Sequence, residues 1–265
     1  MELFRYQPGS SPLVVSIPHV GTHIPPGLAT RMTPAALRLP DTDWHLDRLY
    51  NFLAGLDPTV LMATHSRFVI DLNRPPDNQN LYPGQDTTAL VPVDCGDRSP
   101  IYLDEVPDQS EIEARRARYW NPYHHRLESA LQETKARHGY ALLWDAHSIR
   151  SELPRFFDGP LPDLNLGTAD GRSCGAGLGE HLLAIARGAP TFSSVLNGRY
   201  KGGHITRHFG CPSEHIHAVQ LELSWATYMD EDYPFAFRDE LAAGVRPVLK
   251  KLLTGFIEWG AAAAR

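Results

Sequence analysis

Cysteine is scarce in this sequence, and its placement excludes a disulfide-based fold. Only Cys95, Cys174 and Cys211 occur in 265 residues, and no two of them have C-x-x-C spacing. An odd number of scattered thiols is typical of reduced cysteines in a cytoplasmic protein. We therefore expect free thiols and a cytoplasmic location.

Long apolar runs and clusters of positive charge are also missing. No apolar run approaches the roughly 20 residues that a membrane-spanning helix requires, and MELFRYQPGSSP at the N-terminus does not resemble a secretory signal. With 25 Lys and Arg against 31 Asp and Glu, the net charge is -6, and no basic run is present to neutralise phosphates. We expect neither a membrane nor a nucleic acid as partner.

Short apolar runs alternate with segments of helical periodicity. Strands are expected at 12–18, 60–64, 68–72, 141–145 and 217–224, and helices at 43–56, from 110 onward, at 177–187 and at 238–259. Residues 75–107 and 154–174 are expected to be long loops. This alternation predicts one α/β domain over residues 1–265, a three-layer sandwich with a mixed, mostly parallel sheet.

Four local signals refine the helices. Asp41 or Thr42 is expected to cap the helix at 43–56. Ser110 and Glu113 form a capping-box pattern, Pro122 is expected to kink or restart the helix that follows, and Pro247 is expected to break the last helix.

Polar side chains follow two of the expected strands. His19 comes after the strand at 12–18 and His147 after the strand at 141–145, while Asp43 opens an expected helix. Ligands gather at the carboxyl ends of parallel strands, and two imidazoles with one carboxylate form a catalytic zinc set that leaves a fourth position for water. Asp47 is the competing carboxylate, and a structural acid at a helix start is the other interpretation of Asp43.

One carboxylate lies inside an apolar strand. Glu222 shares a strand face with Gln220 and Ser224, between Leu221 and Leu223. Burial of an unpaired carboxylate is costly. Glu222 is therefore a candidate general base beside a metal, with a buried ion pair as the alternative.

Two arginines are candidates for binding carboxylates. Arg74, with Asn73 before it, ends the expected strand at 68–72, and its planar guanidinium can bind a carboxylate with two hydrogen bonds. Arg207 follows the Gly202-Gly203 pair, where the backbone can turn sharply. A structural ion pair is the alternative for each arginine.

Two further sequence patterns resemble functional motifs but are weaker indications of a site. Gly171-Arg172-Ser173-Cys174-Gly175 matches the G-x-S-x-G nucleophile pattern, but it follows an expected loop where that motif requires a strand. His215 and His217 lie on one strand face and offer a second chelating pair, or they only support the strand of Glu222.

Long segments of the chain resemble the N-formylglutamate amidohydrolase family of histidine degradation. They are SIPHVGTHIP (16–25), DTDWHLDRLY (41–50), SRFVIDLNRPPDNQNLYPG (66–84), LLWDAHSIRSELPRFFDGPLPDLNLGT (142–168), NGRYKGGHITRHFG (197–210) and HAVQLELSWATYMDE (217–231). This family in turn resembles zinc carboxypeptidases and desuccinylases, so a zinc-carboxypeptidase-like fold is expected.

The resemblance implies roles for individual residues. His19 and His147 resemble the first and last zinc histidines of carboxypeptidases, and Glu222 resembles their general base. Carboxypeptidases have a glutamate three residues after the first histidine, where this chain has Thr22, so the second ligand is assigned to Asp43.

The implied substrate is N-formyl-L-glutamate, a small molecule that is cleaved to formate and L-glutamate. Asn73, Arg74 and Arg207 would hold its two carboxylates, and Asp145 would orient a ligand. One zinc ion per chain is expected, although cobalt, nickel and manganese also accept nitrogen and oxygen ligands.

Three other functions compete with this interpretation. The nearest is another metal-dependent N-acylamino-acid hydrolase, such as a desuccinylase or a deacylase. The second is a serine or cysteine hydrolase that uses Ser173 or Cys174. The third is a non-catalytic binder of dicarboxylates, which Glu222 disfavours because a carboxylate repels an anionic ligand.

Overall fold

One mixed β-sheet organises the computed structural model, which describes residues 1–264, and its seven strands run in the order β1-β3-β2-β4-β7-β5-β6. The strands are β1 (Phe4–Gln7), β2 (Leu13–Ile17), β3 (Thr59–Ala63), β4 (Ala141–Ile149), β5 (Leu164–Gly167), β6 (Ser194–Leu196) and β7 (Ile216–Ser224). The pairs β2–β3, β2–β4, β4–β7 and β5–β6 are parallel, whereas β1–β3 and β5–β7 are antiparallel. The predicted mixed, mostly parallel sheet is confirmed.

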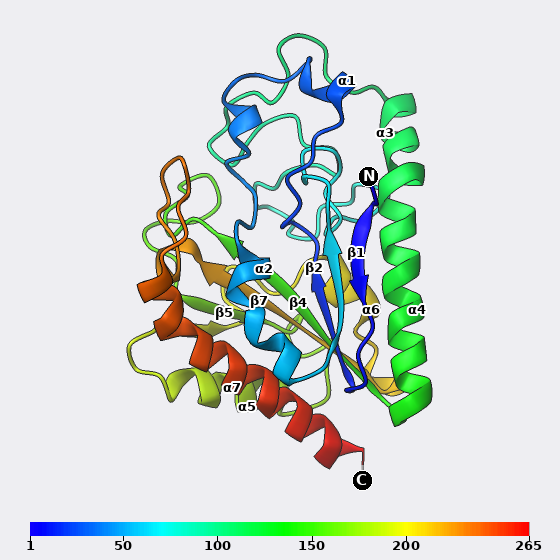
Figure 1. Cartoon of the computed structure of the whole chain (residues 1–265), viewed down its shortest axis with the longest axis vertical. Coiled ribbons are helices and arrows are strands. Elements are labelled where there is room, and N and C mark those ends of the chain that lie inside the picture. The colour runs from blue at the N-terminus through cyan, green and yellow to red at the C-terminus, as the bar shows by residue number, and fades with distance from the viewer. Residues whose placement is uncertain (265) are drawn as a thin grey trace.

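Helices cover both faces of the sheet. They are α1 (Pro26–Ala29), α2 (Leu46–Leu49), α3 (Gln109–Arg115), α4 (Asn121–His138), α5 (Leu178–Arg187), α6 (His204–Phe209) and α7 (Asp239–Ala263). Figure 1 shows α3 and α4 along one face of the sheet, with α5 and α7 against the other. The predicted three-layer arrangement is confirmed.

The central strands are apolar because both of their faces are buried. Every residue of β2 and β7 is buried, as expected for strands covered on two sides. Alternate residues enter different cores: Trp144 and Leu221 pack on the side of α7, and Leu143 and Ala218 on the side of α4. Polar residues in these strands therefore need partners within the protein.

The expected helix at 43–56 is wrong. The four-residue α2 is followed by a 3-10 turn at Asn51–Gly55, and His45 precedes α2 in a left-handed conformation with no side-chain cap. The backbone N–H of Asp43 donates instead to the carbonyl of His19, at 3.0 Å. This contact draws the segment before α2 toward the end of β2.

The expected strand at 68–72 is also wrong. The segment forms turns, with the N–H of Val69 donating to Ser66 O at 2.9 Å and that of Asp71 to Leu90 O at 2.7 Å. Its apolar residues are buried in two separate cores: Ile70 and Leu72 in the core between the sheet and α4, and Phe68 and Val69 in a core outside the sheet. Burial without strand pairing produced the misleading apolar run.

Helix ends differ from the expected ones in two places. Asp108 caps α3 by accepting a hydrogen bond from Glu111 N at 2.8 Å, so Ser110 is not the cap. Helix α7 continues through Pro247 without a break. The helix does restart near Pro122, where a π-helical segment at Arg116–Trp120 leads into α4.

Several short elements carry no periodic signal. β1, β5, β6 and α6 have three to six residues each and were not expected, and β5 interrupts the loop predicted at 154–174. Residues 75–107 do form a long loop, and Figure 1 shows such loops gathered beyond one end of the sheet. They lie at the carboxyl ends of β2 and β3.

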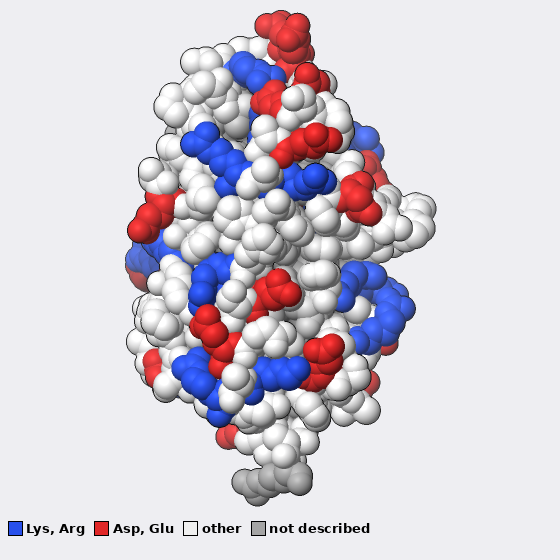
Figure 2. Space-filling model, turned by 90° about the vertical axis from the view of Figure 1, so that its right-hand side faces the viewer, with Lys and Arg blue, Asp and Glu red and all other residues white. Residues whose placement is uncertain are grey.

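Charge is evenly mixed on the face that carries α4. Figure 2 shows basic and acidic side chains interspersed there in small groups. Within residues 1–264, no helix combines the length and the apolar character needed to cross a membrane.

Leucines of α7 provide a test of the packing against the sheet. Leu252 is fully buried, whereas Leu241 on the same helix is 39% exposed. We expect Leu252→Ala to lower the free energy of unfolding by about 2–5 kcal/mol, because it leaves a cavity. Leu241→Ala, the matched control, should change it by less than about 0.5 kcal/mol. Urea denaturation measures both; equal effects would contradict this packing.

Candidate active site

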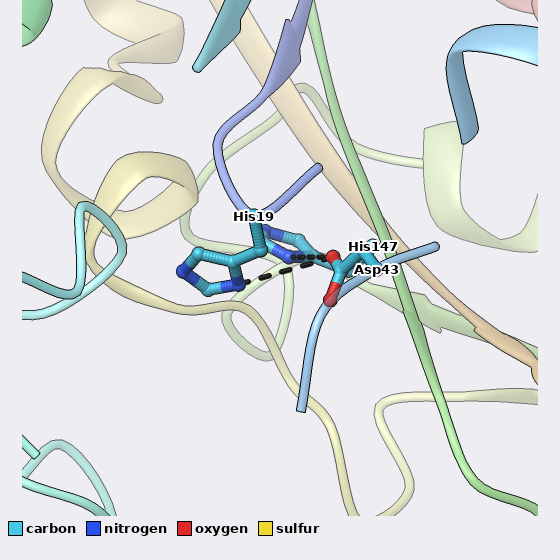
Figure 3. A group of neighbouring side chains, drawn as sticks. All are labelled: His19, Asp43 and His147. Carbon is cyan, nitrogen blue, oxygen red and sulfur yellow. Dashed lines mark hydrogen bonds and ion pairs between the residues drawn. The ribbon is translucent and has the colours of Figure 1, made fainter. Parts of the chain in front are cut away.

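Three buried side chains converge at the carboxyl edge of the sheet (Figure 3): His19, Asp43 and His147. The ligand atoms that they offer all lie within 4.8 Å of one another. Asp43 Oδ2 is 3.1 Å from His147 Nδ1 and 3.8 Å from His19 Nδ1. Two imidazole nitrogens and a carboxylate oxygen at this spacing can hold a divalent metal ion.

Backbone contacts position this group. His19 lies in the turn after β2, and Asp43 is tied to it through the hydrogen bond between their main chains. The N–H of Ser148 donates to Asp43 Oδ2 at 3.2 Å. His147 lies within β4, two residues before its end, and not after the strand as expected.

The structure places Asp43, and not Asp47, at the two histidines. The side chain of Asp43 is 1% exposed, whereas that of Asp47 is 46% exposed and lies 3.9 Å from Arg5. The break of the expected helix explains the difference, since the two aspartates no longer share one helix face.

A second carboxylate stands behind each histidine. Asp71 Oδ1 lies 2.7 Å from His19 Nε2, and Asp145 Oδ1 lies 3.2 Å from His147 Nε2. The contact between Asp71 and His19 is a hydrogen bond, and an outer carboxylate of this kind orients a metal-binding imidazole and leaves its other ring nitrogen toward the metal. Asp145 Oδ1 is close to His147 but makes no hydrogen bond within residues 1–264. The arrangement fits a metal centre. Asp145 was expected in this position, but the contact of Asp71 was missed.

The two histidines differ in proton affinity. Burial, followed by the positive charge of Arg67, lowers the pKa of His19. Burial also opposes the charge on His147, but the carboxylates of Asp145 and Asp43 raise its pKa well above the usual range. A metal ion at this group competes with the proton on His147, so metal binding should weaken as the pH falls.

Glu222 is a buried acid next to this group. β4 and β7 pair in parallel with His147 opposite Glu222, so both side chains extend from the same face of the sheet. Within residues 1–264, no Lys, Arg or His nitrogen lies within 4.0 Å of the Glu222 carboxylate, which disfavours the ion-pair alternative. Burial raises the pKa of Glu222 to about 8.

A cavity opens in front of these residues. It encloses about 830 Å³, including the space at its open mouth, and His19, His147 and Glu222 line it. The loop at 75–107 contributes Tyr82 and other residues to the wall. The cavity therefore brings the candidate metal group and the buried acid to one surface that is open to a small molecule.

Asn73 and Arg74 have different surroundings. The amide Nδ2 of Asn73 lies 2.8 Å from His147 Nε2, and its Oδ1 accepts a hydrogen bond from Ile205 N at 2.8 Å, so Asn73 supports His147. Arg74 lines the cavity and donates to Thr88 Oγ1 at 3.2 Å. Its buried Nε has no hydrogen-bond partner in the described part of the chain.

Arg207 lies outside the cavity as far as residues 1–264 define it. Its Nε donates to Gly202 O at 2.7 Å, and its guanidinium stacks on the ring of Tyr82, with 5.1 Å to the ring centroid. The cavity wall instead contains Arg67, Arg150 and Arg199, which the sequence interpretation missed. Of these three, only Arg67 has a sequence feature that could have identified it, because it lies four residues before Asp71 and can pair with that acid.

The serine or cysteine alternative finds no support. Ser173 is buried and its hydroxyl donates to Ala218 O at 2.8 Å. Burial raises the pKa of the Cys174 thiol to about 11. The cavity walls formed by residues 1–264 contain neither residue. All three cysteines are free, as expected.

The neighbouring histidine pair is also accounted for. The ring of His217 accepts a hydrogen bond from Gly175 N at 3.1 Å and packs edge-on against Trp259. His215 is exposed in the turn before β7. His217 therefore supports the start of β7, as one interpretation held, and the exposed His215 does not share its contacts.

Comparisons with known proteins agree with the resemblance seen in the sequence. The sequence model of the family described as N-formylglutamate amidohydrolase matches residues 11–229. N-formylglutamate deformylases of Pseudomonas aeruginosa and Pseudomonas putida are 48% and 47% identical, and each alignment covers 98% of this chain and 97% of the relative. A crystal structure of N-formylglutamate amidohydrolase from Ralstonia eutropha JMP134 superposes with a TM-score of 0.79 at 26% identity, covering 98% of this chain and 97% of that one.

The two aspartates near α2 form a matched pair for testing the metal group. We expect Asp43→Ala to lose bound metal, because it removes the carboxylate between His19 and His147. Asp47→Ala should keep the metal content of the unmodified protein, since Asp47 is exposed and remote from the histidines. Elemental analysis after dialysis against zinc, with circular dichroism as a folding control, measures both. Metal loss in the Asp47 variant alone would reverse the assignment.

Proposed function

Since this chain belongs to the N-formylglutamate amidohydrolase family and is an amidohydrolase, we propose that it hydrolyses N-formyl-L-glutamate to formate and L-glutamate. The observation that carries the proposal is a buried acid, Glu222, beside a His–Asp–His group on one cavity. We also propose that residues 1–265 form one catalytic domain. The enzyme would act in the cytoplasm and catalyse a step of histidine degradation.

His19, Asp43 and His147 would hold one zinc ion. The donor chemistry supports zinc, since two imidazoles and one carboxylate leave a position open in catalytic zinc sites. When bound, zinc polarises an amide carbonyl and lowers the pKa of water from 15.7 toward about 7. Cobalt, nickel and manganese suit the same donors.

Glu222 moves the proton in the proposed reaction. It accepts a proton from the water that attacks the formyl carbon, and it delivers that proton to the leaving nitrogen as the C–N bond breaks. Opposite charge nearby favours an ionised carboxylate. Glu222, whose pKa burial raises to about 8, is therefore favoured as a base when positive charge occupies the adjacent group.

Arg74 would bind the α-carboxylate of the substrate. Its buried Nε lies 3.9 Å from Asp71 but makes no hydrogen bond within the described part of the chain, and this free donor and the place of Arg74 on the cavity wall support the role. Asn73 would act indirectly by holding His147, and Arg207 by holding Tyr82 against the cavity. Both roles differ from the direct substrate contacts that the sequence predicts for these residues.

The alternative within the same chemistry is a deacylase for larger acyl groups, and a substrate panel separates the two. We expect kcat/KM on the zinc-loaded enzyme to be highest for N-formyl-L-glutamate among its N-formyl, N-acetyl and N-succinyl derivatives. An added methyl group in a confined site is typically worth about 1–3 kcal/mol, or roughly 10- to 200-fold. Faster cleavage of the acetyl or succinyl compound would replace the deformylase proposal with a deacylase.

Glu222→Gln tests the general base, because it keeps the side-chain shape and removes the basic group. We expect kcat to fall by at least about 10²-fold, the lower range for general acid–base catalysis, while zinc content is unchanged. Glu128→Gln makes the same chemical change on the exposed side of α4 and should leave kcat unaltered. Near-normal turnover of the Glu222 variant would show that another group moves the proton.

A further inference from the structure

Arg199 differs from the other arginines at the cavity in having no carboxylate partner. Arg67 lies 2.5 Å from Asp71, and Arg74 lies 3.9 Å from the same carboxylate. Among residues 1–264, no carboxylate oxygen lies within 4.0 Å of the Arg199 guanidinium, although this side chain is half-buried and lines the cavity. A half-buried guanidinium without a counter-ion, on the wall of a cavity, is suited to bind an anionic ligand.

Backbone and aromatic contacts hold Arg199 in place. Its Nε donates to Phe156 O at 2.6 Å, and its Nη2 lies 3.4 Å from Asp86 O. The guanidinium also lies 5.4 Å from the ring centroid of Tyr82 and 5.2 Å from that of Tyr200. These neighbours restrict the side chain without neutralising its charge, so little entropy is lost when it binds a ligand.

The residues around Arg199 are compatible with a bound anion, because the nearby acid is neutralised and a second hydrogen-bond donor is present. Asp86 lines the cavity, but its carboxylate is neutralised by Arg155, at 3.1 and 3.2 Å, and by Arg98, at 2.7 Å. The hydroxyl of Tyr200 is buried and, in the described part of the chain, has no hydrogen-bond partner. It offers a second donor next to the guanidinium.

The position of Arg199 indicates which carboxylate it takes. Arg74 stands three residues from Asp71, which contacts His19, so it is close to the reacting end of the cavity. The α-carboxylate of an N-acylamino acid is attached directly to the carbon that bears the amide nitrogen, whereas the carbon of the glutamate side-chain carboxylate is three bonds away from that carbon. Arg199 is held instead by the backbone oxygens of Asp86 and Phe156, which belong to loops and not to the strands that carry His147 and Glu222.

We infer that Arg199 binds the side-chain carboxylate of the acylamino acid and thereby sets the preference for an acidic side chain; this inference rests on the proposed function. Arg150 is the competing residue, because it also lines the cavity. Its charge is partly matched by Asp232 at 3.9 Å, and it lies over the ring of Trp225.

The test compares N-formyl-L-glutamate with N-formyl-L-glutamine, which lacks the side-chain charge. We expect Arg199→Ala to lower kcat/KM for the glutamate compound by about 10- to 150-fold, the range for one lost charge-assisted contact. The glutamine compound should be affected far less, so the ratio of the two values falls. Structural damage would lower both values and leave the ratio unchanged. Arg199→Lys, which keeps the charge but not the planar fork, should fall between.

Arg246→Ala is the matched control. Arg246 is also half-buried, donates to the backbone oxygens of Leu49 and Arg48, and lies over the ring of Phe237, but it is remote from the cavity. It should leave the ratio as in the unmodified enzyme. The inference would be overturned if Arg199→Ala left the glutamate-to-glutamine ratio of kcat/KM unchanged, or if only Arg150→Ala lowered that ratio.

A binding measurement separates this inference from the proposed function. Calorimetry with L-glutamate and L-glutamine on the zinc-loaded protein should show a preference for L-glutamate that Arg199→Ala removes. If the unmodified protein releases no formate but keeps this preference, the proposed reaction fails and the inference stands. Formate release with an unchanged preference in Arg199→Ala sinks the inference alone. If L-glutamate does not bind in preference to L-glutamine, the inference fails as well.

Discussion

The parallel pairing of β4 with β7 is the contact on which the candidate site depends. Its register sets Asp145 opposite Gln220 and His147 opposite Glu222, so two acids and a histidine share one end of one sheet face. A shift of one residue would turn each of these side chains toward the opposite core. The apolar residues between them prevent that shift, because Trp144 and Leu221 fill the core under α7.

Buried charge at this edge is tolerated because it is shared. Asp71 contacts His19 with one oxygen and Arg67 with the other, and Asp43 lies between two imidazoles. Isolated, each of these groups would be costly to bury, and together they offset one another. Glu222 is the exception, with no cationic group close enough for an ion pair among the residues that the structure describes. An acid in that situation binds a proton readily, which suits a group that must accept one and release it again.

Much of the fold and part of the site could be predicted from the sequence. The long strands, the mixed sheet and α5 follow from apolar runs and helical periodicity. His19, His147 and Glu222 stand out because polar residues at the ends of buried strands, or inside them, need a reason. The strand expected at 68–72 is absent because its apolar residues are buried without strand pairing, and the sequence does not distinguish such burial from that of a strand. Arg199 could not be identified, since its place at the cavity depends on loops that have no periodic pattern. The contact of Arg207 with Tyr82, which lines the cavity, could not be predicted for the same reason, because no local pattern relates the two residues.

The strand order also bears on how the chain is synthesised. β4 lies between β2, which is made early, and β7, which is made late, so one edge of β4 stays unpaired until residues 216–224 have left the ribosome. An exposed, apolar strand edge is prone to pair with other chains, and pairing between distant segments is slow to form. The metal group and its neighbouring acid therefore cannot be assembled together until β7 inserts beside β4, so an open strand edge and an incomplete site persist over the same stretch of synthesis.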